Sequence, residues 1–427
     1  MTNQNGIQVS VCQVGARLHY GAARSFQLKG ALGTLYTDIC ALKGLPSLLR
    51  MIPRSLRSSA LKRLLGRDPI GIPREKIEMF ALLGIEYHLR LSKCKTDGER
   101  IRAHLQMGKQ FSERIARKGL KGATHVYAFS CAGLEIIEAA RSQGVRSIVE
   151  LPLAASEVEH HLLREEWERY PDWEPFFRSD EERGEFAARQ RKEWDIADTI
   201  VVPSKFVASS LEKVGISPDR YTIVPYGVSD LSRETVRVAH DGPLRVLTVG
   251  SVTLRKGPQY TFEAFKLLGK DFDFRLVGGC SFSESVKREL GKRLHLVGDV
   301  PRSEVSEHFQ WADVFLLPSL CEGMATVLIE ALSSGLPVIA TENSGLEIND
   351  GVDGFLVPIR SPAAIAERLD QLASDPVLLS EMSRNAKKRS EDFTLEAYSE
   401  RLYQAMTRSM ISSQREFSGA AGMGKEV

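Results

Sequence analysis

Short apolar runs separated by helix-like segments dominate the second half of the chain. The apolar runs fall at 244–250, 272–278, 294–298, 313–319 and 337–341. Between them, the apolar spacing predicts helices over 257–269, 283–290, 303–311 and 325–334. Apolar runs without alternation, each followed by a helix, are typical of a parallel sheet covered on both faces. This half is therefore predicted to be a doubly wound, Rossmann-like domain.

The first half repeats this pattern less regularly. Its strand candidates are 7–15, 123–130, 146–153, 198–204 and 221–228. A helix is predicted over 205–215, ending at Gly215, because glycine tolerates the left-handed conformation found at helix ends. Residues 156–197 predict a long, charged helical region that is broken near Pro171 and Pro175.

The predicted fold class is α/β, with two Rossmann-like, doubly wound parallel-sheet domains facing each other across a cleft. In such sheets, ligands bind outside the carboxyl ends of the strands. The predicted segments are an N-terminal domain over 1–228, a linker over 229–243, a C-terminal domain over 243–392, a helix over 393–412 that packs back on the first domain, and a flexible tail over 413–427.

Composition narrows the class of protein. The 427 residues carry 57 Lys and Arg against 55 Asp and Glu, and this balance argues against a dedicated nucleic-acid binder. The six cysteines are scattered without a C-x-x-C pair, which favours reduced thiols over disulfides or a zinc site. The sequence shows neither a secretory signal nor a run of about 20 apolar residues. We therefore expect a cytoplasmic protein that at most lies on a membrane surface.

Two adjacent cations follow the predicted strand 244–250. Arg255 and Lys256 lie in the turn that begins at Gly250 and Ser251 and leads into a helix. A helix N-terminus and neighbouring cations together favour an anion such as a phosphate group. The alternative is an ordinary solvated Arg-Lys pair.

Two glutamates follow the predicted strand 313–319. Glu322 lies in the turn and Glu330 lies in the next helix among apolar residues. This separation suits a ligand with a polar group at each end. The amides of Gly323, Met324 and Ala325 are predicted to face outward at the helix start, where negative charge is favoured. The alternative is that Glu330 lies on an exposed helix face.

Taken together, these segments resemble family 4 retaining glycosyltransferases of the GT-B fold. Residues 318–341 resemble the family signature, in which two glutamates are separated by seven residues, as Glu322 and Glu330 are here. The Arg255-Lys256-Gly257 turn matches the family's basic motif. Further similar segments are 198–204, 343–348, 353–357 and 225–228, the last with Tyr226 where asparagine is usual.

The resemblance implies a role for each matching residue. Glu330 would bind the ribose of a nucleotide-sugar donor, and Arg255 and Lys256 would hold its diphosphate. Glu322, with the amides of Gly323 and Met324, would contact the donor sugar. The implied donor site further includes Gly250, Ser251, Ala325, Thr326 and Gly15. The scheme needs no cofactor and no metal ion.

The implied function is transfer of a sugar, with retention of configuration, from a nucleotide-sugar to a saccharide or lipid-linked acceptor. The product would be a cell-surface polysaccharide or a glycolipid. Two alternatives stay open, a non-catalytic subunit that binds nucleotide-sugars and a nucleotide-sugar epimerase on the same fold.

The first domain departs from the family pattern. Many family members carry a histidine near the donor sugar, but residues 150–155 contain none. His19, in the loop after the first strand, is a candidate on the acceptor side. His160 and His161 are expected on a solvated helix face. The pair Asp271 and Asp273 resembles a metal-binding D-x-D motif, but it leads into a strand at the end away from the cleft.

Residues 43–76 are both basic and apolar. They hold nine Lys and Arg against two Asp and Glu, interleaved with leucines. Such a stretch is predicted to rest on an anionic membrane surface. The alternative is a solvated pair of basic helices.

Overall fold

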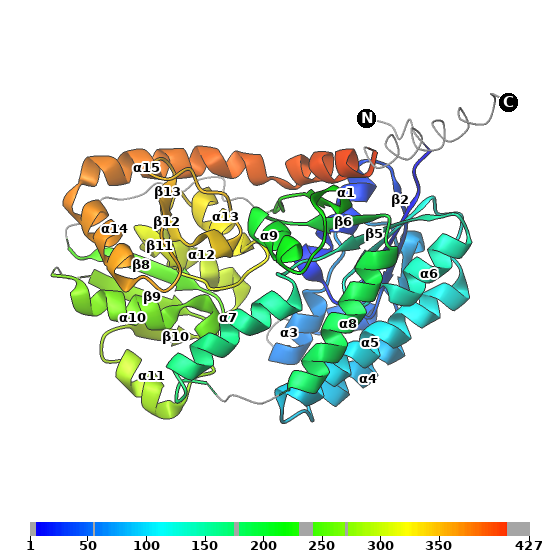
Figure 1. Cartoon of the computed structure of the whole chain (residues 1–427), viewed down its shortest axis with the longest axis horizontal. Coiled ribbons are helices and arrows are strands. Elements are labelled where there is room, and N and C mark those ends of the chain that lie inside the picture. Colours follow the sequence, from blue (N-terminus) through cyan, green and yellow to red (C-terminus); the bar gives the residue numbers. More distant parts are fainter. Residues whose placement is uncertain (1–5, 54–55, 175–178, 230–241, 270–271, 408–427) are drawn as a thin grey trace.

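Two parallel sheets lie side by side in one elongated molecule (Figure 1). The structure, a computed structural model, describes residues 6–53, 56–174, 179–229, 242–269 and 272–407. The predicted tail, most of the predicted linker, and Pro175 and Asp271 lie outside the described residues.

The first sheet has the strand order β3-β2-β1-β4-β5-β6-β7, and all its pairings are parallel. The strands are β1 (Val9–Gln13), β2 (Leu32–Thr37), β3 (Ile77–Met79), β4 (His125–Phe129), β5 (Arg146–Glu150), β6 (Thr199–Val202) and β7 (Tyr221–Ile223). The strand order reverses between β1 and β4, which opens a crevice at the carboxyl ends of these two strands.

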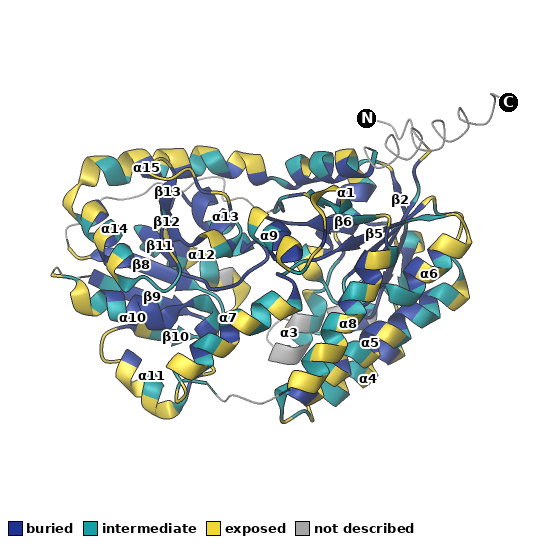
Figure 2. Cartoon of the chain, in the orientation of Figure 1, coloured by how far each residue is buried: buried dark blue, intermediate teal, exposed yellow. Residues whose placement is uncertain are grey.

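The second sheet has the strand order β10-β9-β8-β11-β12-β13 and is also parallel. Its strands are β8 (Leu244–Val249), β9 (Phe272–Val277), β10 (His295–Gly298), β11 (Val314–Leu317), β12 (Val338–Ala340) and β13 (Gly354–Leu356). Here the order reverses between β8 and β11. The central strands of both sheets are buried, as Figure 2 shows by their dark colour, whereas β7 and β10 at the edges are partly exposed.

Every strand predicted from the sequence is present, and the two-domain α/β architecture is confirmed. Three strands, β2, β3 and β13, were not predicted. β3 and β13 have three residues each, and neither is a continuous run of apolar residues, because Glu78 interrupts β3 and a glycine begins β13. β2 is interrupted by Gly33 and mixes polar with apolar residues, so its sequence lacks the continuous apolar run of its neighbours.

Helices connect the strands in both domains. Those of the first half are α1 (Gly21–Leu28), α2 (Leu45–Leu48), α3 (Ser59–Leu65), α4 (Ala81–Leu91), α5 (Asp97–Lys118), α6 (Leu134–Ser142), α7 (Ser156–Arg169), α8 (Asp180–Ile196) and α9 (Lys205–Lys213). Those of the second half are α10 (Pro258–Leu267), α11 (Glu284–Leu290), α12 (Arg302–Trp311), α13 (Thr326–Ser333), α14 (Pro362–Ser374) and α15 (Pro376–Arg389). A last helix covers 395–407.

Helix α7 belongs to the first half of the sequence but packs on the second domain (Figure 1). Its Glu166 is fully buried and accepts hydrogen bonds from Tyr260 Oη at 2.6 Å and Gln259 Nε2 at 3.0 Å. Arg360 forms an ion pair with the same carboxylate. Just beyond the helix, Trp173 packs edge-on against Phe282, with ring centroids 5.0 Å apart. No local sequence pattern predicts this packing of α7 on the second domain.

The last helix crosses in the opposite direction, from the second domain to the first, along the upper edge of Figure 1. Its Tyr398 is buried in the core of the first domain, edge-on to Tyr226 with centroids 6.0 Å apart. A Cβ on Gly227 would lie 2.1 Å from the carbonyl oxygen of Thr394, so only glycine permits this approach.

Tyr226, the residue that departs from the motif expected from the resemblance, makes a specific contact in the first domain. Its hydroxyl donates a 2.5 Å hydrogen bond to Glu150, a fully buried carboxylate at the end of β5. Tyr127 donates a second bond of 2.5 Å to the same group. Burial raises the pKa of Glu150, while the two tyrosine hydroxyls oppose that rise. Tyrosine is long enough to reach this carboxylate.

We predict that Glu166→Ala lowers the free energy of unfolding by about 3 kcal/mol, because it leaves Arg360 and two polar groups of the second domain without their buried acceptor. Chemical denaturation followed by tryptophan fluorescence measures the change. Glu168→Ala, on an exposed position of the same helix, is the matched control and is expected to have little effect. Equal stability of the two variants would contradict a buried role for Glu166.

Candidate functional site

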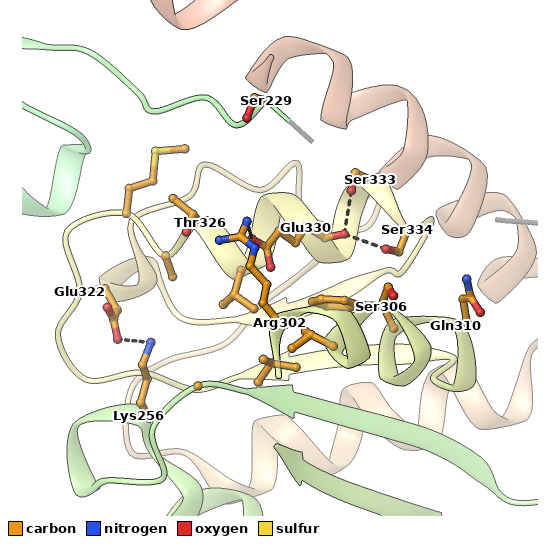
Figure 3. Close-up of a pocket in the computed structure, with 17 residues that line it drawn as sticks. Ser229, Lys256, Arg302, Ser306, Gln310, Glu322, Thr326, Glu330, Ser333 and Ser334 are labelled. Atoms are coloured by element: carbon orange, nitrogen blue, oxygen red, sulfur yellow. Dashed lines mark hydrogen bonds and ion pairs between the residues drawn. The ribbon is translucent and has the colours of Figure 1, made fainter. Parts of the chain in front are cut away.

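A cavity of about 870 Å³ lies beside the carboxyl ends of β8 and β11, the point where the strand order of the second sheet reverses (Figure 3). Its lining includes seven of the residues proposed from the sequence, namely Gly250, Lys256, Glu322, Met324, Ala325, Thr326 and Glu330. Helix α12 closes one side with Arg302, Ser306 and Gln310. The strand-end motifs therefore converge on one site.

Glu322 is held by both predicted cations. Its Oε1 atom lies 2.6 Å from Lys256 Nζ and 2.9 Å from Arg255 Nη1. Arg255 Nη1 also donates a hydrogen bond to the carbonyl oxygen of Cys321 at 2.9 Å. Glu322 is buried, so the two ion pairs are shielded from water and stronger than surface pairs. In these two ion pairs, a single carboxylate oxygen faces two cations.

The turn that carries the cations is fixed by its glycine and proline. Gly257 has φ +78°, and a Cβ there would lie 2.1 Å from the carbonyl oxygen of Pro318 after β11. Pro258 then begins α10, a position where proline's missing N–H costs nothing. The turn after β8 is thereby pressed against the turn after β11, which brings Lys256 to Glu322.

Glu159, which the sequence interpretation missed, adds a first-domain carboxylate to this cluster. It lies on α7, and burial raises its pKa while the charge of Arg255 opposes the rise. Burial alone would lower the pKa of Arg255, but Glu322 and Glu159 outweigh it and keep the guanidinium charged. Only the docking of α7 on the second domain brings Glu159 here, so no local sequence pattern indicates it.

The helix start after Glu322 differs from the prediction in one respect. The amide of Ala325 donates to the carbonyl oxygen of Ser344 at 2.9 Å, so it is not offered to a ligand as expected. Of the three amides expected to donate to a ligand, those of Gly323 and Met324 therefore remain candidates. Ser251 is exposed and does not line the cavity.

Glu330 faces the cavity from α13, with its side chain 29% exposed, and is neither buried nor on an outer face. Arg302 Nη2 lies 3.6 Å from Glu330 Oε1 (Figure 3). The guanidinium of Arg302 also contacts His19 Nε2 of the first domain. The sequence interpretation missed Arg302, since a charged residue at the start of a helix is common.

His19 and Gly15 lie in a strained loop after β1. Leu18, His19 and Tyr20 all have positive φ, at 50°, 49° and 62°. Each such residue costs on the order of 1–3 kcal/mol, so the loop must be held by other contacts. Asp38 supplies one of them, by accepting the amide of Gly15 at 2.9 Å.

Asp38 is buried at the end of β2 and forms a second contact, an ion pair of 2.9 Å with Arg67. It thus joins the loop at the cleft to the basic segment 43–76. The sequence signal was present, because Asp38 directly follows a strand, but that strand was not predicted.

The two helical histidines differ. His161 is 74% exposed, as predicted, whereas His160 is only 20% exposed and lies 3.3 Å from Asp180. The prediction of a solvated face is therefore wrong for His160, because α8 covers it. Among the described residues, no group of His, Cys, Asp and Glu is arranged to hold a metal ion.

The first domain clamps the loop that follows Glu322. Ser204 Oγ donates to the carbonyl oxygen of Gly323 at 2.5 Å, and the amide of Tyr226 lies 3.1 Å from Met324 Sδ. A Cβ on Gly323 would lie only 1.7 Å from the carbonyl oxygen of Pro152. The geometry of this loop, which connects Glu322 to α13, thus depends on the position of the first domain.

The sequence profile of the family described as "Glycosyl transferases group 1" matches residues 233–389. The second domain belongs to this family. The amylovoran biosynthesis glycosyltransferase AmsK of Erwinia amylovora is 32% identical over 191 residues, which are 40% of this chain and 44% of that protein. The chain spans about half the length of the curated relatives it matches.

Solved structures with the same fold cover almost the whole chain. Sucrose-phosphate synthase from Thermosynechococcus elongatus aligns with a TM-score of 0.62 at 18% identity, over 95% of this chain and 100% of that one. HepE of Anabaena in complex with UDP aligns with a TM-score of 0.61 at 13% identity, over 94% and 99%. The chain therefore has the GT-B fold.

We predict that Gly323→Ala lowers the free energy of unfolding by about 1–3 kcal/mol and separates the domains, because the added methyl group has no room beside Pro152. Calorimetry and small-angle X-ray scattering measure the two effects. The control is Gly184→Ala in α8, where nothing lies within 4 Å, and this change is expected to stabilise the helix by up to about 1 kcal/mol. Unchanged melting and scattering of Gly323→Ala would contradict the close contact.

Proposed function

We propose that the chain is a retaining glycosyltransferase, which moves a sugar from a nucleotide-sugar to a saccharide or lipid-linked acceptor in the synthesis of a cell-surface polysaccharide. The observation that carries the proposal is that Glu322, which pairs with Arg255 and Lys256, lines one cavity together with Lys256 and Glu330. Membership of the second domain in group 1 and the likeness to AmsK support it.

The cavity has the size and charge pattern that a nucleotide-sugar needs. About 870 Å³ lies within the usual range for small-molecule sites. Lys256 and Arg255 would hold the diphosphate at one end, and Glu330 would accept hydrogen bonds from the ribose hydroxyls at the other. We propose a uridine nucleotide first, because HepE, with the same fold, was solved with UDP.

Binding of the diphosphate would rearrange the ion pairs around Glu322. The diphosphate competes for both cations, so Glu322 is released to accept hydrogen bonds from the donor sugar. When the bond between the sugar and the diphosphate breaks, negative charge grows on the departing phosphate oxygen. Arg255 and Lys256 are already fixed at that place, and such preorganised charge is often the largest contribution to rate enhancement.

Glu330 requires a similar exchange, because Arg302 lies 3.6 Å away. The ribose would take the place of part of this contact. Arg302 also contacts His19, so a movement of Arg302 away from Glu330 would alter a contact with the first domain. Contact between the domains would exclude water, whose attack on the donor would compete with the acceptor.

A panel of ligands separates the two ends of the site. For the wild-type protein, UDP at a hundred times its dissociation constant is expected to add about 2.7 kcal/mol of stability, measured by thermal shift. Glu330→Ala is expected to weaken the binding of UDP, UMP and uridine alike, because all three ligands carry the ribose. Lys256→Ala is expected to weaken the binding of UDP but not that of uridine, because uridine has no diphosphate. Lys266→Ala, an exposed lysine on α10, is the control.

Absence of stabilisation by any nucleoside diphosphate would contradict the proposed donor site. Stabilisation without sugar transfer to any glycan or lipid-linked acceptor would favour a binding subunit, and release of a free sugar would favour an epimerase. Nuclear magnetic resonance of the product's anomeric proton tests retention.

We predict that Glu322→Gln binds UDP several-fold more tightly than the wild type but turns over at least about a hundredfold more slowly. The neutral amide no longer competes with the diphosphate for Arg255 and Lys256, yet it cannot accept hydrogen bonds from the sugar as a carboxylate does. Isothermal titration and a donor-consumption assay measure the two effects separately. Weaker UDP binding by this variant would contradict the proposed exchange of ion pairs.

A further inference from the structure

Large exposed apolar side chains are concentrated in one segment of the first domain. Those between residues 51 and 89 are Met51 (84% exposed), Leu56 (74%), Ile70 (62%), Leu82 (74%), Ile85 (44%) and Leu89 (58%). Such a concentration marks an interaction surface more often than scattered apolar residues do. The glycosyl transfer proposed above uses none of these side chains.

Three of them form a continuous stripe on α4. Leu82, Ile85 and Leu89 are three and four residues apart, so they share one face of the helix. We call this stripe the α4 ridge. The opposite face is fixed to the domain, with Leu83 buried and Gly84 packed against Asp38 and Ile39. The ridge therefore points away from the protein, near the lower edge of the first domain in Figure 1.

The sequence around the ridge is strongly basic. Residues 43–95 contain twelve Lys and Arg against four Asp and Glu, whereas the whole chain has a net charge of only +2. Lys62, Arg74, Lys93 and Lys95 are exposed. Segment 43–76 lies beside α4, because its Arg67 pairs with Asp38, which packs against Gly84 of that helix.

We propose that the first domain docks on an anionic phospholipid bilayer, with the α4 ridge inserted among the headgroups and the surrounding lysines and arginines on the lipid phosphates. Apolar side chains flanked by cations are the pattern of interfacial helices. A symmetric dimer through the ridge would bring two basic surfaces together, so charge disfavours a second copy as the occupant. Among the described residues, no helix is long and apolar enough to cross a membrane.

This proposal changes the surface expected from the sequence. At least four cations of segment 43–76 are bonded to other groups of the first domain: Lys43 Nζ, Lys76 Nζ and Arg57 Nε donate to the carbonyl oxygens of Ile77, Leu32 and Ile52, and Arg67 pairs with Asp38. The ridge lies outside 43–76 altogether. Asp38 contacts both the helix and the Gly15 amide, so a docked ridge would hold the cleft near the lipid surface. This last consequence rests on the proposed function, whereas the docking itself does not.

The experiment is co-sedimentation of the purified full chain with vesicles, without donor or acceptor. Vesicles of phosphatidylglycerol and phosphatidylcholine are compared with vesicles of phosphatidylcholine alone. The wild type is expected to bind the anionic vesicles, and less so at high salt. The triple variant Leu82→Ser, Ile85→Ser and Leu89→Ser is expected to bind about tenfold more weakly or worse. Replacing Lys93 and Lys95 by Gln is expected to cost about fivefold each.

The control is Leu267→Ser with Val377→Ser, which removes exposed apolar side chains from the second domain and is expected to bind as the wild type does. Thermal shift with UDP checks that each variant is folded, and it tests the donor site separately from docking. Three results would overturn the proposal: no binding of the wild type to anionic vesicles, equal binding by the ridge variant, or a wild-type dimer that the ridge variant abolishes.

Discussion

The conformation of the loop between Glu322 and α13 depends on a contact between the two domains at Gly323. Its Cα lies against the carbonyl oxygen of Pro152, and its own carbonyl oxygen accepts the hydroxyl of Ser204. No other amino acid fits, because any Cβ would overlap the first domain. The conformation that places Glu322 at one end of the loop and α13 at the other is therefore maintained by a partner domain. A cleft built in this way changes shape whenever the domains move.

The charged groups of the site are paired before any ligand arrives. Glu322 shares one oxygen between two cations, and Glu330 lies near Arg302. In a half-buried cleft, each charged group loses part of its hydration, and a partner of opposite charge offsets that loss. A ligand of matching charge can exchange partners with little loss, whereas water cannot replace the pairs as well. These ion pairs therefore stabilise the site and can still be displaced by a charged ligand.

Much of this arrangement could be predicted from the sequence. The carboxyl ends of parallel strands lie at one edge of the sheet, so the residues that directly follow the strands lie close together there. The turns with Arg255 and Glu322 were placed correctly beside each other for that reason. Glu159, Arg302 and Asp38 could not be placed by local pattern. Glu159 reaches the site through the docking of α7 on the other domain. Arg302 is identified by its contacts with Glu330 and His19, which form only in the folded chain. Asp38 follows a strand whose glycine and polar residues hide its apolar pattern.

The two crossings of the chain also bear on how the protein folds during synthesis. The core of the first domain includes Tyr398 and Leu402, so it cannot be completed until residues beyond the second domain have left the ribosome. Helix α7 must likewise wait for α10 to cover Glu166. Contacts so distant in sequence form slowly and leave apolar surface exposed in the meantime. The nascent first domain should therefore depend on chaperones for longer than its position in the chain suggests.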